Sequence, residues 1–142
     1  MFVTVWLGIL NIRTGELSFA NGGHTSPRLL HRDGSGEWVK GKSGIMLGSV
    51  EDLCYKPRSL TLVPGDILYL YTDGVVESNN CAGEFYEGER LQNALSSGQA
   101  RKLGPVEMCL MVKEDLDAFA GGVPQFDDIT MLALEFKGLQ EI

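Results

Sequence analysis

Residues 62–78, LVPGDILYLYTDGVVES, contain the features that decide the fold. Pro64 has a fixed φ that favours a turn over residues 63–66. Residues 67–71 are then apolar or aromatic at every position, so both faces of this strand are expected to lie in the interior. Asp73 and Gly74 follow directly. The sequence therefore predicts a central strand with a carboxylate at its end.

A second apolar strand with acidic residues at one end lies near the C-terminus, in residues 125–136, QFDDITMLALEF. Asp127 and Asp128 immediately precede its apolar part. Carboxylates held close together repel one another unless a divalent cation supplies compensating charge, and oxygen-only ligands favour Mg²⁺ or Mn²⁺. The same residues have ordinary interpretations, because Asp-Gly is a common turn dipeptide and acidic pairs solvate loops.

The remaining pattern predicts an α+β domain. Apolar alternation and Gly-rich breaks predict an antiparallel meander in the first forty residues and a further strand over 58–62. Helices are expected over 89–97 and from Pro105 onward. The second helix is expected to bury a face formed by Val106, Cys109, Leu110, Lys113, Leu116 and Phe119. Strands, two helices and one last strand imply that the final strand returns into an earlier sheet.

Composition and charge narrow the range of partners. The chain has 142 residues, a net charge of −7 and a pI near 4.7, so it should repel nucleic acids and anionic lipids. The apolar run over residues 2–10 is too short to cross a membrane. Cys54, Cys81 and Cys109 form no C-x-x-C pair, which predicts reduced thiols, a cytoplasmic location and no zinc site.

Three separated motifs together resemble the SpoIIE/RsbU-type branch of the PPM (PP2C-like) serine/threonine phosphatases. They are residues 1–30, MFVTVWLGILNIRTGELSFANGGHTSPRLL, and the two stretches quoted above, with GIMLGSV at 44–50 between the first two. The resemblance implies an antiparallel β-sandwich flanked by helices in α-β-β-α layers. It also implies a binuclear Mn²⁺ or Mg²⁺ centre at one edge.

The resemblance assigns roles to particular residues. Asp73 and Asp127 are expected as metal ligands and catalytic residues, with Gly74 and Asp128 beside them in the metal site. Two such ions would activate a water for attack on a phosphoserine or phosphothreonine, so that no protein nucleophile is required. His24 and Glu77 are expected as supporting residues. Each has a plainer alternative, since His24 can simply hydrogen-bond backbone and Glu77 can cap a polar segment.

Family members also have, near their beginning, an Asp-Val-Ser-Gly-Lys-Gly-like segment whose aspartate bridges the metals. Residues 1–142 contain no such segment. We therefore expect one partial domain, truncated at the N-terminus, that binds metal weakly and has little or no activity alone. We also expect an open sheet edge beside residues 2–10, which favours a homodimer through this N-terminal strand.

Three functions are compatible with these features. The first is a phosphatase that acts on a phosphorylated STAS-type anti-sigma-factor antagonist, as the resemblance implies. The second is a catalytically dead phosphatase-like module that binds a partner or regulates another chain. The third is an unrelated metal-dependent phosphoesterase acting on a small molecule, which the aspartate pairs alone would permit.

Overall fold

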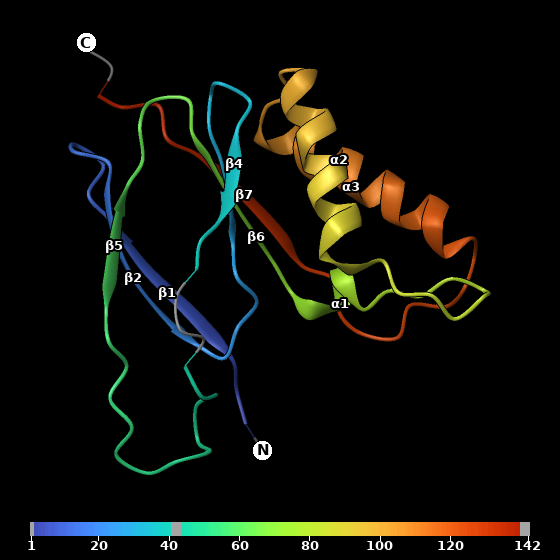
Figure 1. Ribbon diagram of the computed structural model, residues 1–142, viewed down its shortest axis with the longest axis horizontal. Helices are drawn as coiled ribbons and strands as arrows, with labels where there is room; N and C mark the ends of the chain where they lie inside the picture. Colours follow the sequence, from blue (N-terminus) through green and yellow to red (C-terminus); the bar gives the residue numbers. More distant parts are fainter. Residues whose placement is uncertain (1, 41–43, 140–142) are drawn as a thin grey trace.

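A computed structural model describes residues 2–40 and 44–139 of the chain (Figure 1). These residues form two antiparallel sheets, with strand orders β1-β2-β5 and β4-β3-β6-β7. The strands are β1 (Val5–Leu10), β2 (Glu16–Gly22), β3 (Arg28–Leu30), β4 (Gly36–Trp38), β5 (Arg58–Thr61), β6 (Ile67–Tyr71) and β7 (Met131–Glu135). The helices are α1 (Asp73–Val76), α2 (Glu87–Ala100) and α3 (Pro105–Ala120).

Strand β6 is the centre of the second sheet, as its apolar sequence predicts. It pairs with β3 on one side and with β7 on the other. Successive side chains of a strand point to opposite faces. Ile67, Tyr69 and Tyr71 accordingly join the core cluster under the helices, while Leu68 joins the cluster between the two sheets. Both faces of this strand are therefore buried.

Helices α2 and α3 cover one face of the second sheet, and the first sheet covers the other (Figure 1). The buried stripe of α3 consists of Met108, Val112 and Leu116, which recur every four residues. Val106 and Leu110 are exposed, so the helix face predicted from the sequence was partly wrong. None of the helices in the described ranges combines the length and apolar composition that crossing a membrane would require.

The first forty residues do not form a single meander. Strands β1 and β2 form a hairpin in the first sheet, whereas β3 and β4 pair in the second. The chain changes sheets after Gly23, whose φ of 78° is a left-handed conformation that favours glycine. A side chain at Gly23 would also lie 3.1 Å from the backbone of Met46. The Gly-Gly pair thus breaks the predicted meander into two hairpins.

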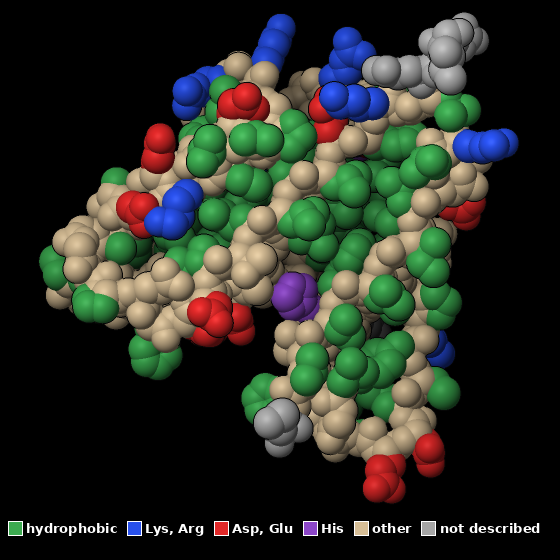
Figure 2. Space-filling model, turned by 180° about the vertical axis from the view of Figure 1, so that it is seen from behind, with side chains coloured by type: hydrophobic (Ala, Val, Ile, Leu, Met, Phe, Trp, Pro, Cys, Tyr) green, Lys and Arg blue, Asp and Glu red, His purple; other side chains and the backbone are tan. Residues whose placement is uncertain are grey.

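Strands β1 and β7 are edge strands in the described part of the chain. Apolar side chains on them are well exposed, in particular Leu7, Ile9 and Leu132. The view from behind shows hydrophobic side chains over the middle of the molecule (Figure 2). One face of β7 is therefore exposed although its sequence is apolar, because no neighbouring strand or layer among the described residues covers it.

The pairing of β6 with β7 continues beyond both strands. The Thr72 N–H donates to the Thr130 carbonyl at 3.0 Å, and the Thr72 hydroxyl donates to the Asp128 carbonyl at 2.8 Å. The same hydroxyl accepts the Thr130 N–H at 3.0 Å. Gly74 then passes so close that a Cβ there would lie 2.4 Å from the Asp128 carbonyl oxygen. The two segments are held in contact by hydrogen bonds of the Thr72 backbone and hydroxyl and by the close approach of Gly74, rather than by apolar packing.

Replacement of Gly74 by alanine should therefore destabilise the chain. The added methyl group has no room beside a backbone atom, and such overpacking costs about 1–3 kcal/mol. Gly88→Ala is the matched control, since the nearest contact of a Cβ there is an ordinary 3.7 Å to Trp38 and alanine favours a helix. Urea denaturation measures the free energy of unfolding of both variants. Equal stabilities would contradict this account of Gly74.

Candidate metal centre

The residues predicted to bind metal come from the C-terminal end of β6 and the N-terminal approach to β7. In an antiparallel pair these two ends lie side by side. Asp73 is the first residue of α1, directly after β6, and Asp127 and Asp128 lie just before β7. A Cβ added to Gly74 would lie 3.3 Å from the Asp127 carbonyl oxygen. The structure thus brings all four predicted residues, Asp73, Gly74, Asp127 and Asp128, to one end of the sheet.

The carboxylates at this end retain free oxygens. Asp73 Oδ1 accepts the N–H of Gly74 at 3.2 Å, and Asp127 Oδ1 accepts the N–H of Asp128 at 2.7 Å. All three aspartates are exposed. Oxygen donors of this kind suit Mn²⁺ and Mg²⁺. Across the described residues, however, no three His, Cys, Asp or Glu side chains are arranged so that they could hold a metal ion together.

The Gly74 carbonyl accepts the Ser78 hydroxyl at 2.7 Å, which uses one of its two lone pairs. What the structure shows of Gly74 is the close approach to residues 127 and 128 described above. Its place in the metal site stays a prediction, and the absence of a side chain is what lets the two acidic segments meet.

His24 lies in a turn that reaches the same end of β6. Asn21 holds this turn from both sides, donating to the His24 carbonyl at 2.9 Å and accepting the His24 N–H at 2.8 Å. The next residue, Thr25, donates its hydroxyl to the Tyr71 carbonyl. The His24 ring is half-buried, with Nδ1 3.2 Å from the Thr4 hydroxyl. The Thr25 hydroxyl thus fixes this turn to Tyr71, which is the last residue of β6 and lies two residues before Asp73.

Glu77 ends the short helix α1. Its N–H donates to the Asp73 carbonyl at 2.9 Å, so Glu77 lies one helical turn beyond Asp73, and its side chain is exposed. This backbone contact ends α1 and does not test the alternative that Glu77 caps the polar segment after it. The Glu77 carboxylate forms no hydrogen bond or ion pair with the described residues, and its supporting role at the metal site stays a prediction.

Sequence reasoning missed three residues that build this end of the sheet: Asn21, Thr25 and Thr72. Each acts through short-range polar contacts to backbone that a hydrophobic pattern does not reveal. Asn21 and Thr72 each stand immediately before a motif that the sequence does show, Gly-Gly-His and Asp-Gly. Polar residues flanking these motifs were the available signal.

The cysteines give no sign of a thiolate nucleophile. Burial raises the pKa of the Cys109 thiol, which disfavours the reactive thiolate form. Cys54 and Cys81 are exposed free thiols.

Comparison with known proteins identifies the family. The chain matches the family model of stage II sporulation protein E (SpoIIE) over residues 1–137. Protein IcfG of Synechocystis sp. (strain ATCC 27184 / PCC 6803 / Kazusa) is 33% identical over 134 residues. That alignment covers 94% of this chain and 20% of IcfG, so the chain spans about a fifth of this relative.

Solved structures share the fold. The RsbU and RsbW domains of Rv1364c from Mycobacterium tuberculosis give a TM-score of 0.75 at 24% identity, covering 97% of this chain and 37% of that one. The SiaA-PP2C domain of Pseudomonas aeruginosa gives 0.72 at 27% identity, covering 87% and 47%. The Mn-presoaked phosphatase domain of SpoIIE from Bacillus subtilis gives 0.72 at 16% identity, covering 98% and 59%.

These similarities confirm the predicted α+β fold with antiparallel sheets and flanking helices. The chain spans at most 59% of the three structures. With 137 of its residues matched by one family model, the chain belongs to the SpoIIE family and has the fold of PP2C-like phosphatase domains.

Proposed function

We propose that this chain is the C-terminal, metal-binding part of a metal-dependent serine/threonine protein phosphatase domain. The observation that carries the proposal is the meeting of the Asp73 and Asp127 segments at one end of the second sheet, through Thr72 and Gly74. Two acidic segments far apart in sequence are joined there by backbone contacts. Carboxylates on two segments that are held together can bind the same cation, whereas carboxylates on two separate loops could not.

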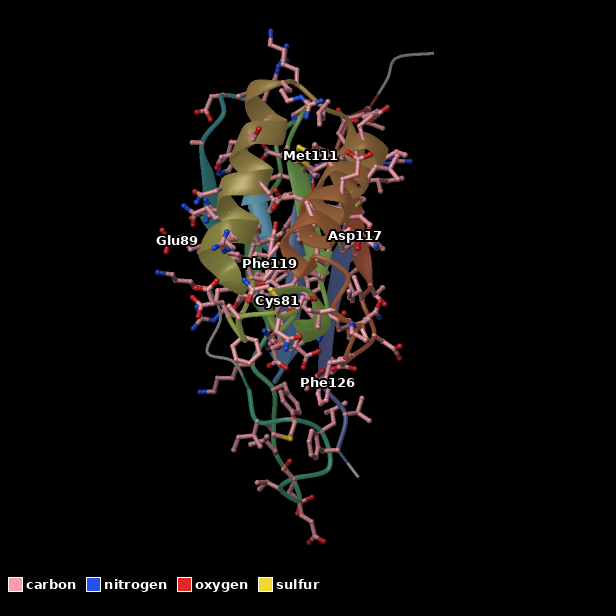
Figure 3. All side chains as sticks on the ribbon, turned by 90° about the vertical axis from the view of Figure 1, so that its right-hand side faces the viewer. Cys81, Glu89, Met111, Asp117, Phe119 and Phe126 are labelled. Atoms are coloured by element: carbon pink, nitrogen blue, oxygen red, sulfur yellow. The ribbon has the colours of Figure 1, made fainter. Side chains whose placement is uncertain are left out.

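In this proposal Asp73 and Asp127 bind Mn²⁺ or Mg²⁺, with Asp128 as an adjacent carboxylate. When bound, the metal would supply an activated water for attack on the phosphorus. Thr72 and Gly74 set the spacing of the acidic segments, and the turn with His24 borders the site. Phe126, next to Asp127, is 91% exposed. It lies below the two long helices, whereas Met111 on α3 lies near their upper end (Figure 3).

The proposed substrate is a phosphoserine or phosphothreonine on a regulatory protein, such as a STAS-type anti-sigma-factor antagonist. This follows from the resemblance to SpoIIE/RsbU-type phosphatases, and two matched structures carry RsbU and SpoIIE in their names. A net charge of −7 favours a protein partner over nucleic acid. We propose a cytoplasmic location, which the reduced cysteines would tolerate.

Binding of Mn²⁺ should depend on the two ligand aspartates. We expect weak binding by the chain, and Asp73→Asn and Asp127→Asn should each weaken it by roughly tenfold or more. Asp117→Asn is the matched control, because Asp117 is an exposed carboxylate on α3 that pairs with Lys113. Calorimetric titration with Mn²⁺ measures all four proteins. Equal affinities for the parent and both ligand variants would contradict the proposed site.

Turnover by the chain alone should be low or undetectable, because the family's bridging aspartate lies in a segment that residues 1–142 do not contain. Phosphate release from a phosphoserine peptide in the presence of Mn²⁺ measures it, with the SiaA-PP2C domain as reference. A rate similar to the reference would contradict the partial-domain interpretation. Any residual turnover should disappear in Asp73→Asn, and turnover that persists there would exclude Asp73 as a ligand.

We further propose that the chain forms a homodimer through β1. This strand has one unpaired edge among the described residues, and Leu7 and Ile9 are 61% and 70% exposed on it. An exposed apolar edge strand is a template for pairing with a second copy. The homodimer proposal therefore rests on the unpaired edge of β1 and on the exposed side chains of Leu7 and Ile9.

Light scattering at micromolar concentration should therefore give a dimer mass. Leu7→Lys should shift the protein to monomer, because a lysine on an edge strand opposes edge-to-edge pairing. Leu110→Lys is the control, since Leu110 on α3 is similarly exposed at 59%. A monomeric parent chain, or equal dissociation by both variants, would contradict the β1 interface.

A further inference from the structure

The second sheet carries a hollow at the end opposite Asp73. It has a volume of about 580 Å³ and lies where the β3–β4 turn, the turn before β6, the α2–α3 connection and the end of β7 meet. Small-molecule sites typically measure about 300–1,000 Å³. Ile67 is the first residue of β6, and Asp73 lies two residues past its last. At about 3.3 Å per residue the two lie roughly 20 Å apart. The hollow is therefore separate from the candidate metal centre.

Positive charge gathers at this hollow, which we call the basic pocket and define by Arg32, Lys102 and Lys137. In Figure 2, Lys and Arg side chains lie along the upper margin of the molecule. Glu135 also lines the pocket and lies 3.7 Å from Lys137, so it offsets that one cation. Arg32 and Lys102 form no ion pair within the described part of the chain. Two uncompensated cations thus face one hollow in a chain whose net charge is −7.

Lys102 occupies a position that usually belongs to glycine. It follows the C-cap of α2 with a φ of 56°, in the left-handed region. At the end of α3 the corresponding left-handed residue, with a φ of 59°, is Gly121. A side chain in this conformation is disfavoured by steric contact with its own backbone. Asp52 and Glu87 have the same conformation, so what distinguishes Lys102 is its place in the lining of the pocket.

The walls of the basic pocket are fixed to one another. Gln99 Nε2 donates to the carbonyls of His31 and Ser35, at 3.0 Å and 2.9 Å, which ties α2 to the β3–β4 turn. His31 Nδ1 lies 3.3 Å from Oδ1 of the buried Asp66, whose Oδ2 accepts the Val63 N–H at 3.0 Å. A preformed site loses less entropy on binding.

Two carboxylates lie near His31, and neither forms an ion pair with Arg32 or Lys102 in the described part of the chain. Asp66 is committed to His31 and to the Val63 N–H, and Glu37 Oε1 lies 3.7 Å from His31 Nε2. Apolar side chains complete the lining, of which Leu103 and Pro64 are accessible while Ile67 and Met108 lie buried behind them. The pocket therefore offers cations beside an apolar surface.

We propose that the basic pocket binds a small organic phosphate, with its phosphate against Arg32 and Lys102 and its organic part against Leu103 and Pro64. A phosphate ester carries close to two negative charges, which matches two uncompensated cations, and an arginine can bind phosphate through two parallel hydrogen bonds. A volume of about 580 Å³ exceeds what a bare phosphate fills. This site is independent of the proposed phosphatase function.

The test is a titration with phenyl phosphate, followed by NMR of the ¹⁵N-labelled chain at low ionic strength. We expect saturable shifts that include residues 32, 99 and 102. Lys102→Gly should weaken binding roughly tenfold, as expected for losing one charged hydrogen bond. Its melting temperature should be unchanged or higher, because glycine favours the left-handed conformation. Loss of binding without loss of stability separates a binding role from a structural one.

Arg101→Ala is the matched control, since Arg101 adjoins Lys102 but does not line the pocket. It removes the same charge and should leave affinity within about twofold, because exposed charges act weakly at a distance. Equal weakening by Arg101→Ala and Lys102→Gly would overturn the site, as would the absence of saturation up to about 10 mM. Inorganic phosphate that binds as tightly as phenyl phosphate would overturn the organic part of the proposal. Asp73→Asn should bind phenyl phosphate like the parent, which separates this site from the metal centre.

Discussion

The burial of β6 on both faces and both edges is the constraint on which the rest of the structure depends. Ile67, Tyr69 and Tyr71 face the helices, Leu68 faces the first sheet, and β3 and β7 take the edges. Tyr69 is fully buried, and burial raises its pKa, so the phenol stays neutral. A strand in this position cannot carry charge along its length. Its carboxylates can stand only at its two ends, as Asp66 and Asp73 do.

These two aspartates show how position decides between a structural and a chemical role. The Asp66 carboxylate is buried and uses both oxygens, one toward His31 and the other toward the Val63 N–H. It fixes the turn that starts β6. The Asp73 carboxylate is exposed and uses one oxygen on the neighbouring Gly74 N–H. Only the second arrangement leaves oxygen lone pairs free for a cation.

Sequence reasoning predicted β6 at its observed bounds, because a short apolar run between a Pro-Gly turn and Asp-Gly has few other interpretations. It located α2 and α3, although α2 extends beyond residues 89–97 at both ends. It missed α1, which is a single turn and carries no periodic signal. It misplaced part of the buried face of α3, since Val106 and Leu110 fit helical spacing as well as Met108 and Val112 do. Which stripe is buried depends on the sheet beneath, and the sequence of one helix does not contain that information.

The residue pattern made an approach of Asp73 to Asp127 one interpretation among others and the family resemblance favoured it; antiparallel topology explains it. The end of β6 must lie beside the start of β7 once the two strands pair, and α2 and α3 return the chain between them. Because α2 and α3 pack on the second sheet, they help to hold β6 and β7, and with them Asp73 and Asp127, in position. The same topology places the start of β6 beside the end of β7, where the basic pocket lies. At physiological ionic strength charges are screened within about 8 Å, so two ends roughly 20 Å apart act as electrostatically independent surfaces. An acidic end suited to cations and a basic end suited to anions can thus coexist on one strand pair without either weakening the other.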